Sequence, residues 1–389
     1  MPGRRRTLLA VSCVFVGNGV VVGAWAVRVA EVQRDHGLGE AGLGAALVCV
    51  GLGALLAMPA TGVLATRFGS AACIRVLIVL VALAPAIAAA SGSVPLLLLG
   101  LAVLGAGNGG LDVSMSTQAV AVERMLGRPV MSTLHALYSA GYLLSALVGG
   151  LVANAGLGIE SHFAIVGALA AATVLATSPW LILDRPERSA GDARPRLVWP
   201  SRRLLLLGLI AFGALFTEGS ITDWVSVYVK HVLEGSAAVA GGALGAFGAG
   251  MALSRLTGDR LRSRFGAVPL VAVGAALTGT VLAISLALAT PAATIVALLL
   301  CGFGLGNCFP VALAAAGFVK SDAGVASSVA SVATIGYLGF LMGPALIGLL
   351  TTALSLPGAL CSLVVAMAAI LLLARQVRPA DAARGGMQT

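Results

Sequence analysis

Twelve uninterrupted apolar runs, each close to 20 residues or longer, constrain this chain more than any other feature of its sequence. A helix needs about 20 apolar residues to cross ~30 Å of hydrocarbon, whereas strands of a membrane barrel alternate apolar and polar residues in segments of about ten. The sequence therefore predicts an all-α membrane protein with twelve transmembrane helices. The runs cover roughly residues 7–29, 41–65, 71–91, 94–121, 130–154, 161–183, 204–229, 236–257, 267–289, 292–318, 324–352 and 357–375.

The scarcity of charge excludes a soluble enzyme. Only 10% of the residues are charged, against about 25% in an ordinary soluble domain, so the chain lacks the side chains to cover a water-facing surface. The first run follows three arginines and has the features of a signal peptide. Eleven further runs leave no soluble domain to be secreted, so we interpret it as a retained helix.

The distribution of basic residues predicts the orientation. If the N-terminus is cytosolic, 21 of the 24 Lys and Arg residues fall on the cytosolic side, and only Arg28, Arg34 and Lys230 fall outside. Short cytoplasmic loops carry such an excess of basic residues. We therefore expect the cytoplasmic (inner) membrane, with both termini in the cytosol. The net charge of +9 then reflects topology, and no nucleic-acid partner is expected.

An internal repeat divides the chain into halves. Arg67-Phe68-Gly69 recurs 197 residues later as Arg264-Phe265-Gly266, and the glycines at 105, 107 and 109 recur at 302, 304 and 306. Gly141-Tyr142-Leu143 matches Gly336-Tyr337-Leu338 at an offset of 195. We predict two six-helix bundles, 1–183 and 204–376, joined by a cytosolic linker at 184–203 and followed by a cytosolic tail at 377–389.

Neither the cysteines nor the glycines indicate a cofactor. The six cysteines all lie inside apolar runs, without CxxC spacing or histidine partners, so no disulfide and no metal site is expected. The glycine ladders lie inside apolar runs, not between a strand and a helix, so they are not nucleotide loops. They predict close packing between helices.

The whole chain resembles the major facilitator superfamily of secondary transporters. That family carries Gly-x-x-x-Asp-Arg-x-Gly after its second helix, and residues 62–69 match this motif, with Thr66 in place of the aspartate. The fourth run, with Gly107-Asn108 and Asp112, and the seventh, with Thr217-Glu218-Gly219, are similar to the fucose-permease-related bacterial branch. The resemblance implies a major facilitator fold, in which helices one, four, seven and ten line a central cavity and transport proceeds by alternating access.

A polar residue occurs near mid-depth in each of those four helices. The residues are Asn18 in the first run, Asn108 and Asp112 in the fourth, Glu218 in the seventh and Asn307 in the tenth. We predict that they bind substrate. For the asparagines the alternative is a hydrogen bond that merely joins neighbouring helices.

Two of these residues are carboxylic acids, Asp112 and Glu218, and a charge near the bilayer centre costs at least ~2.5–3.5 kcal/mol. We expect no Lys or Arg at their depth, and a carboxyl group without a cationic partner takes up a proton when it leaves water. We therefore predict that both couple transport to protons. Phe309 stands at the repeat position of Asp112, so the predicted proton site is confined to one half.

Two tryptophans lie toward the outer ends of helices one and seven. Trp25 and Trp224 are predicted to flank the outer mouth and stack on substrate. The alternative is membership of the interfacial aromatic belt. Arg28 and Asp223 lie at similar outer positions, and we predict that they pair.

Several charged residues near the cytosolic ends are candidates for gating. Arg67, Glu123, Arg264 and Asp322 are predicted to form salt bridges that close the inner mouth. The alternative is that they only carry the excess positive charge of the inner side. His135 is expected to be a hydrogen-bonded core residue, with a second proton site as the alternative.

The predicted function is secondary active transport of a small polar solute, such as a sugar or a related metabolite, coupled to protons. The expected partners are that solute, protons and the lipid bilayer, and the expected state is a monomer. No nucleophile–base pair is visible, so we expect no enzyme. The alternatives are a proton-coupled exporter of drugs or natural products, and a membrane sensor or scaffold that transports nothing.

Overall fold

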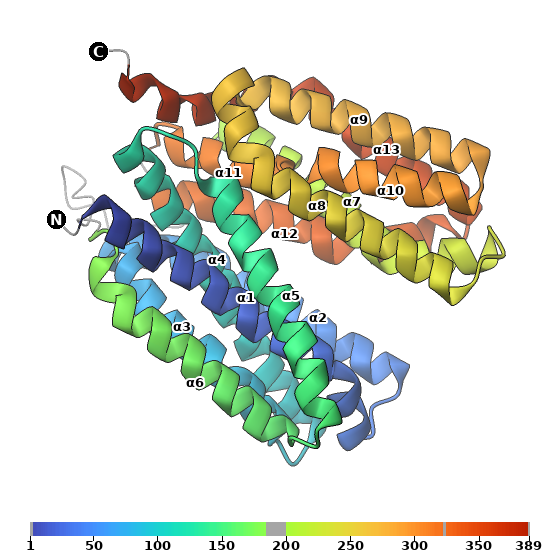
Figure 1. Ribbon diagram of the computed structural model, residues 1–389, viewed down its shortest axis with the longest axis horizontal. Coiled ribbons are helices and arrows are strands. Elements are labelled where there is room, and N and C mark those ends of the chain that lie inside the picture. The colour runs from blue at the N-terminus through green and yellow to red at the C-terminus, as the bar shows by residue number, and fades with distance from the viewer. Residues whose placement is uncertain (1–2, 184–199, 322–323, 388–389) are drawn as a thin grey trace. The chain divides into compact units, whose positions relative to one another are not determined.

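A computed structural model describes residues 3–183, 200–321 and 324–387. It contains twelve helices long and apolar enough to cross a membrane, and no strand occurs in these described ranges (Figure 1). The predicted all-α fold with twelve transmembrane helices is confirmed. The predicted linker, 184–203, lies mostly outside the described residues.

The chain forms two compact units. The first contains most of the N-terminal helices and the first turns of α12, up to Ala330, and the second contains the rest. The first-half elements are α1 (Arg4–Asp35), α2 (Glu40–Phe68), α3 (Ser70–Ala89), α4 (Val94–Leu126), α5 (Met131–Asn154), α6 (Ile159–Thr177) and η1 (Ser178–Trp180). The second-half elements are α7 (Arg202–His231), α8 (Ala237–Phe265), α9 (Ala267–Leu288), α10 (Pro291–Leu305), α11 (Cys308–Phe318), α12 (Gly324–Leu350), α13 (Leu356–Leu373) and η2 (Ala374–Met387). Residues 127–133, which include the start of α5, are grouped with the second unit.

Glycines allow α2 and α4 to touch in the first unit. A Cβ atom added at Gly105 would lie 1.9 Å from the carbonyl oxygen of Val50, and one added at Gly53 would lie 2.1 Å from that of Ala102. No side chain fits at either position. The two backbones therefore meet directly, as the glycine ladder predicts.

The second unit repeats this contact between α8 and α10 at the same spacing. A Cβ atom at Gly302 would lie 2.1 Å from the carbonyl oxygen of Phe247, and one at Gly250 would lie 2.0 Å from that of Leu299. Each of the four positions is 197 residues after its counterpart in the first unit. The internal repeat read from the sequence is thus a repeat of packing geometry.

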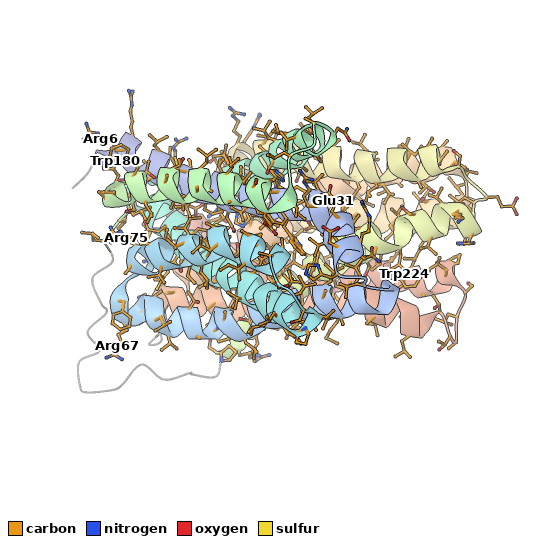
Figure 2. All side chains as sticks on the ribbon, turned by 90° about the horizontal axis from the view of Figure 1, so that it is seen from below. Arg6, Glu31, Arg67, Arg75, Trp180 and Trp224 are labelled. Carbon is orange, nitrogen blue, oxygen red and sulfur yellow. The ribbon has the colours of Figure 1, made fainter. Side chains whose placement is uncertain are left out.

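The polar side chains of the first unit are arranged along its length (Figure 2). Arg6, Arg67, Arg75 and Trp180 lie at one end of its helices, and Glu31 lies toward the other end. The guanidinium carbon of Arg6 lies 5.7 Å from the centroid of the Trp180 ring. The end of the first unit that holds these arginines is therefore the basic end.

The tenth predicted helix is broken in the second unit. The sequence predicts one run over 292–318, whereas α10 ends at Leu305 and α11 begins at Cys308. Pro310 explains the break, because it has no N–H to donate to the carbonyl group of Gly306 four residues before it. The repeat position of Pro310 is Val113. Helix α4, which is 33 residues long in all, continues through Val113 without a break.

The segment predicted as a tail, 377–389, begins inside η2 and packs against the second unit. Val377 and Ala380 are fully buried. The buried guanidinium group of Arg262 donates to the carbonyl oxygen of Ala380, and Asp381 Oδ1 accepts a hydrogen bond from the N–H of Ala267 at 2.8 Å. Asp381 thus caps the first turn of α9.

Candidate functional site

In the first unit, the predicted polar residues gather on α1 and α4. Asn18 is buried, and its Nδ2 lies 3.9 Å from the sulfur of Met115 on α4. Asn108 and Asp112 are four residues apart on α4, hence on one face, and Asp112 is 4% exposed. The buried side-chain oxygens of Asn18 and Asn108 have no hydrogen-bond partner among the described residues. Unsatisfied buried polar atoms are rare, and a ligand site is one explanation for them.

In the second unit, Glu218 forms an ion pair. Its Oε1 on α7 lies 3.6 Å from a terminal guanidinium nitrogen of Arg255 on α8, with the two side chains 25% and 14% exposed. The expectation that no Lys or Arg lies at this depth is wrong for Glu218. Arg255 lies ten residues before the end of α8, so it belongs to the membrane-spanning helix and not to the loop that follows it. An arginine inside an apolar run was the signal that sequence reasoning missed.

Arg255 also binds the break between α10 and α11. Its Nε donates to the carbonyl oxygen of Gly306 at 3.4 Å. That carbonyl lacks its usual helical donor because residue 310 is proline. The same guanidinium group therefore connects the carboxylate on α7 with a backbone carbonyl group at the end of α10.

Asn307 holds the break against α8 from the other side. Its Nδ2 donates to the backbone carbonyl of Ser254 at 2.8 Å and to the Ser254 hydroxyl at 2.7 Å. A Cβ atom at Gly258 would lie 1.9 Å from Asn307 Oδ1, and this oxygen has no hydrogen-bond partner among the described residues. Asn307 thus has a clear structural role at the break.

Burying the ion pair of Glu218 and Arg255 in the second unit costs free energy. An ion pair taken out of water loses hydration that the pair itself seldom repays, and intramembrane ionisable groups are functional candidates by default. Binding sites of many transporters include interrupted membrane helices; here the interruption is short, and Gly306 and Asn307 keep right-handed helical backbone angles. Glu218, Arg255 and the α10–α11 break are therefore the strongest candidate site of the second unit.

The two predicted aromatic residues have different surroundings. Trp25 is only 7% exposed, and its ring packs on Phe163 with centroids 6.1 Å apart. Trp224 is half-buried on α7, and its ring lies 3.4 Å from the place where a Cβ atom on Gly348 would stand. Substrate contact at either ring stays a prediction.

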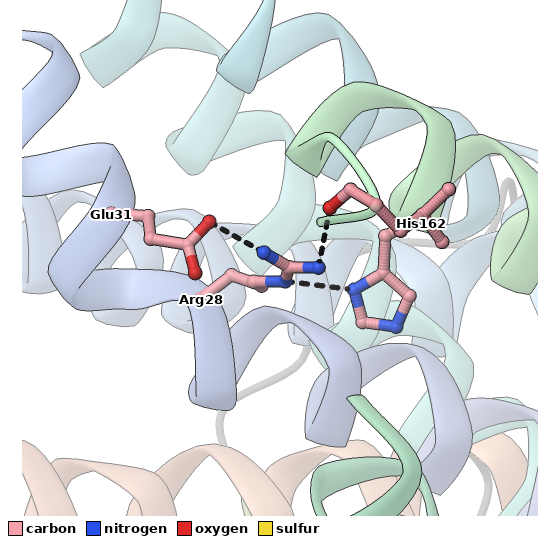
Figure 3. A network of polar contacts seen from close by, with 4 residues as sticks. Arg28, Glu31 and His162 are labelled. Atoms are coloured by element: carbon pink, nitrogen blue, oxygen red, sulfur yellow. Dashed lines mark hydrogen bonds and ion pairs between the residues drawn. The ribbon is translucent and has the colours of Figure 1, made fainter. Parts of the chain in front are cut away.

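The predicted pair of Arg28 with Asp223 would join the two units and stays a prediction. The Arg28 guanidinium group forms an ion pair with Glu31 and hydrogen bonds with His162 and the carbonyl of Leu157, all within the first unit (Figure 3). Asp223 is exposed on α7. Residue separation along the chain hides these contacts, because His162 lies 134 residues after Arg28.

The predicted gating residues are in varied environments. Arg67 and Arg264 are exposed, and each guanidinium group lies over the ring of the phenylalanine that follows it, at 5.0 and 5.2 Å. Glu123 is fully buried on α4. Asp322 lies outside the described residues. A gating role for these four residues stays a prediction.

His135 is buried on α5, and its ring meets that of Phe15 edge-on at 5.2 Å. The cysteines in the described part of the chain are all free thiols. Among the same residues, no three His, Cys, Asp or Glu side chains are grouped closely enough to hold a metal ion. The chemistry of the candidate site thus comes from the carboxyl, amide and guanidinium groups described above.

Known proteins place the whole chain in one family. The model of the Major Facilitator Superfamily matches residues 7–334. An uncharacterized MFS-type transporter of Yersinia pestis is 32% identical over 342 residues, which cover 88% of this chain and 88% of that protein. Membrane protein MosC of Rhizobium meliloti is 27% identical over 92% of this chain and 87% of its own length.

Solved structures agree on the fold. The E. coli fucose:proton symporter FucP superposes with a TM-score of 0.73 at 16% identity, over 94% of this chain and 97% of that chain. The human organic anion transporter MFSD10 superposes with a TM-score of 0.78 at 16% identity, over 96% and 100%. With the twelve helices and the repeated packing, these matches show that the chain is a multi-pass membrane transporter that belongs to the major facilitator superfamily.

Proposed function

We propose that the protein moves a small polar solute, such as a sugar or a related metabolite, by proton-coupled alternating access. The observation that carries this proposal is the ion pair of Glu218 and Arg255, which is bound to the broken helix α10–α11. A hydroxyl-rich solute offers both donors and acceptors. The Glu218 carboxylate accepts from such groups, and the Arg255 guanidinium group donates to them.

The first unit has polar groups of its own. Asn18, Asn108 and Asp112 present amide and carboxyl oxygens from α1 and α4, the helices equivalent to α7 and α10 in the repeat. Asp112 and Glu218 are the proposed proton carriers. Protonation of Glu218 removes its charge from Arg255, while the guanidinium group keeps its bond to the Gly306 carbonyl and can donate to solute oxygens. Proton binding and solute binding are linked through this one side chain.

The known relatives support a transport function but do not identify the solute. One structural neighbour is a fucose:proton symporter and another is an organic anion transporter. At this low sequence identity, the structural likeness establishes only the fold. The buried polar groups of each unit favour a hydroxylated solute over an apolar drug, because such groups are costly unless a ligand satisfies them.

The proposed orientation places both termini in the cytosol, with the protein in the cytoplasmic membrane as a monomer. The basic end of the first unit, which holds Arg6, Arg67 and Arg75 (Figure 2), supports this orientation, since cytoplasmic ends carry the excess of Lys and Arg. The proposed organisation keeps two six-helix bundles, 1–183 and 204–376, connected by a cytosolic linker.

Uptake into proteoliposomes tests the proposal. A thermal-shift screen of monosaccharides and organic acids on the purified chain selects the solute, and uptake is then measured with and without a pH gradient. We expect accumulation that a protonophore abolishes. Binding without flux would favour a sensor, and proton-driven efflux of apolar drugs would favour an exporter.

A further inference from the structure

A buried arginine joins three segments of the first unit at the end opposite its basic end. Arg28 on α1 is 2% exposed. Its guanidinium group forms an ion pair with Glu31 one turn later, donates to His162 Nδ1 at 3.2 Å, and donates to the carbonyl oxygen of Leu157 at 2.9 Å (Figure 3). Leu157 lies in the turn between α5 and α6, and His162 lies in the first turn of α6. Arg28 thus fastens α1 to the start of α6.

The chemistry of the contact fixes the protonation state of His162. The Arg28 guanidinium group carries only donors and does not lose its proton. His162 Nδ1 must therefore accept, which requires a neutral imidazole with its hydrogen on Nε2. A proton added to Nδ1 would place a donor against a donor and a second positive charge beside the guanidinium group. The contact exists only while His162 is neutral.

The charged groups around His162 leave this second charge without a partner of its own. Those that act on it electrostatically are Arg28 and Glu31, both on α1. On α3, which also packs against α6, the titratable residues are Cys73 and Arg75, and Arg75 binds Ser178 at the far end of α6. The charged residue of α6 itself is Glu160, which is exposed, and η1 carries none. On α5, whose Gly149 faces the imidazole, the titratable residues are His135, Tyr138 and Tyr142, all at least seven positions before Gly149. Glu31 already pairs with Arg28, so protonation leaves the site with net positive charge.

The contact lies next to the packing of Trp25 on α6. Trp25 lies one turn before Arg28, and its ring packs on Phe163, the residue after His162. The rings of His162 and Phe163 lie 5.9 Å apart. Gly149 on α5 leaves the space for the imidazole, because a Cβ atom there would lie 2.9 Å from His162 Cε1. Movement of His162 away from Arg28 would disturb the contact of α1 with α6 at Trp25.

We propose that His162 is a proton-binding site whose protonation releases Arg28 from α6 and from the turn before it, and so loosens α1 around Trp25. Histidine is the side chain that ordinarily changes charge between about pH 5 and pH 8. The site shares no residue with the proposed proton carriers Asp112 and Glu218. It stands on contacts within the first unit, so it does not depend on the proposed transport reaction, and its test needs no solute.

Quenching of Trp25 fluorescence by acrylamide tests the proposal directly. Trp180, Trp199 and Trp224 are replaced by phenylalanine in the full-length chain, and quenching is measured in nanodiscs between about pH 8 and about pH 5, the interval in which histidine changes charge. We expect the quenching constant of Trp25 to rise on acidification. His162→Asn keeps an acceptor near Nδ1 but cannot be charged, so its quenching constant should stay at the high-pH value throughout. His231→Asn, at an exposed histidine on α7, is the matched control and should keep the rise. A flat pH response in the parent chain, or an unchanged response in His162→Asn, would overturn the proposal.

Nitrogen NMR of histidine-labelled protein gives a second measurement, which is made first on the parent chain. The imidazole of His162 should be neutral at about pH 8, with the hydrogen on Nε2 and an unprotonated Nδ1, and should become doubly protonated on acidification. Arg28→Gln should remove the strong preference for that tautomer. A hydrogen on Nδ1 of His162 at high pH, or an imidazole that stays neutral at about pH 5, would overturn the proposal.

Discussion

Arg255 Nε donates to the carbonyl oxygen of Gly306 at 3.4 Å. Pro310 cannot donate the usual helical hydrogen bond to this carbonyl group, because proline has no N–H. A proline in the middle of a transmembrane helix leaves a backbone acceptor that must be satisfied by another group. In this chain an arginine from α8 supplies the donor, and the same guanidinium group pairs with Glu218. A structural requirement of the broken helix and the charge of the candidate site therefore depend on one side chain.

Arg255 and Pro310 should show energetic coupling. Arg255→Gln is expected to lower the free energy of unfolding by about 1–3 kcal/mol, because the Gly306 carbonyl loses its donor. In a Pro310→Ala background the cost should be smaller, since the backbone N–H at residue 310 can then bond to that carbonyl. Unfolding in detergent of the four variants gives the coupling energy. Arg260→Gln, at an exposed arginine on the same helix, should change little. If Arg255→Gln lowers the free energy of unfolding equally in both backgrounds, the hydrogen bond of Arg255 to the Gly306 carbonyl does not contribute to stability.

A methyl group at Gly258 should be destabilising. Its Cβ atom would lie 1.9 Å from Asn307 Oδ1, so Asn307 must leave Ser254 or α8 must move, at a typical cost of about 1–3 kcal/mol. The measurement is the midpoint of thermal unfolding of Gly258→Ala. Gly245→Ala on the same helix, where nothing lies within 4 Å, should be neutral or slightly stabilising. Equal midpoints for the two variants would contradict the packing described for Asn307.

Asp381 should stabilise the second unit as a helix cap. Asp381→Ala removes the acceptor for the N–H of Ala267, and loss of a capping side chain typically costs about 1 kcal/mol. Asp381→Asn keeps an acceptor oxygen and should cost less. The midpoints of thermal unfolding of the two variants are compared with that of the parent chain. If the alanine variant is as stable as the asparagine variant, the segment after α13 does not hold α9.

The orientation predicts which sites a topology reporter reaches. A reporter fused after Arg188 should indicate a cytosolic site, and one inserted at the exposed Gly92 should indicate an extracellular site. The reason is that the basic residues fix the cytosolic side. Alkaline phosphatase and green fluorescent protein at each site give opposite signals. The reverse pattern at either site would contradict the twelve-helix topology with cytosolic termini.

Features that depend on local residue type could be read from the sequence. The spans follow from apolar run length, because hydrocarbon thickness fixes helix length. The contacts at Gly105 and Gly302 follow from glycine spacing repeated at 197 residues. The burial of Asn18 and Asp112 could be predicted because both residues lie well inside apolar runs. Pro310 was also visible, and it could have located the break between α10 and α11.

Features that depend on tertiary contacts could not be read in this way. The partner of Glu218 is Arg255 of α8, which is visible inside an apolar run, but no local feature of the sequence shows that its side chain meets α7. The bond between Arg28 and His162 joins residues 134 positions apart, whereas charge alone suggested a pair with Asp223. The η2 segment is polar in sequence and is ordered by its contacts with Arg262 and Ala267.

The central claim is that buried carboxyl groups couple solute movement to protons, and accumulation by Asp112→Asn proteoliposomes tests it most directly. The substitution keeps volume and hydrogen bonding and removes the charge. With fucose as the first probe and, if it does not bind, the solute from the thermal-shift screen, we expect no accumulation driven by a pH gradient, while exchange of labelled for unlabelled solute continues. Glu218→Gln should weaken solute binding, because it leaves Arg255 without its carboxylate. Accumulation by Asp112→Asn against the solute gradient at wild-type rates would contradict the claim.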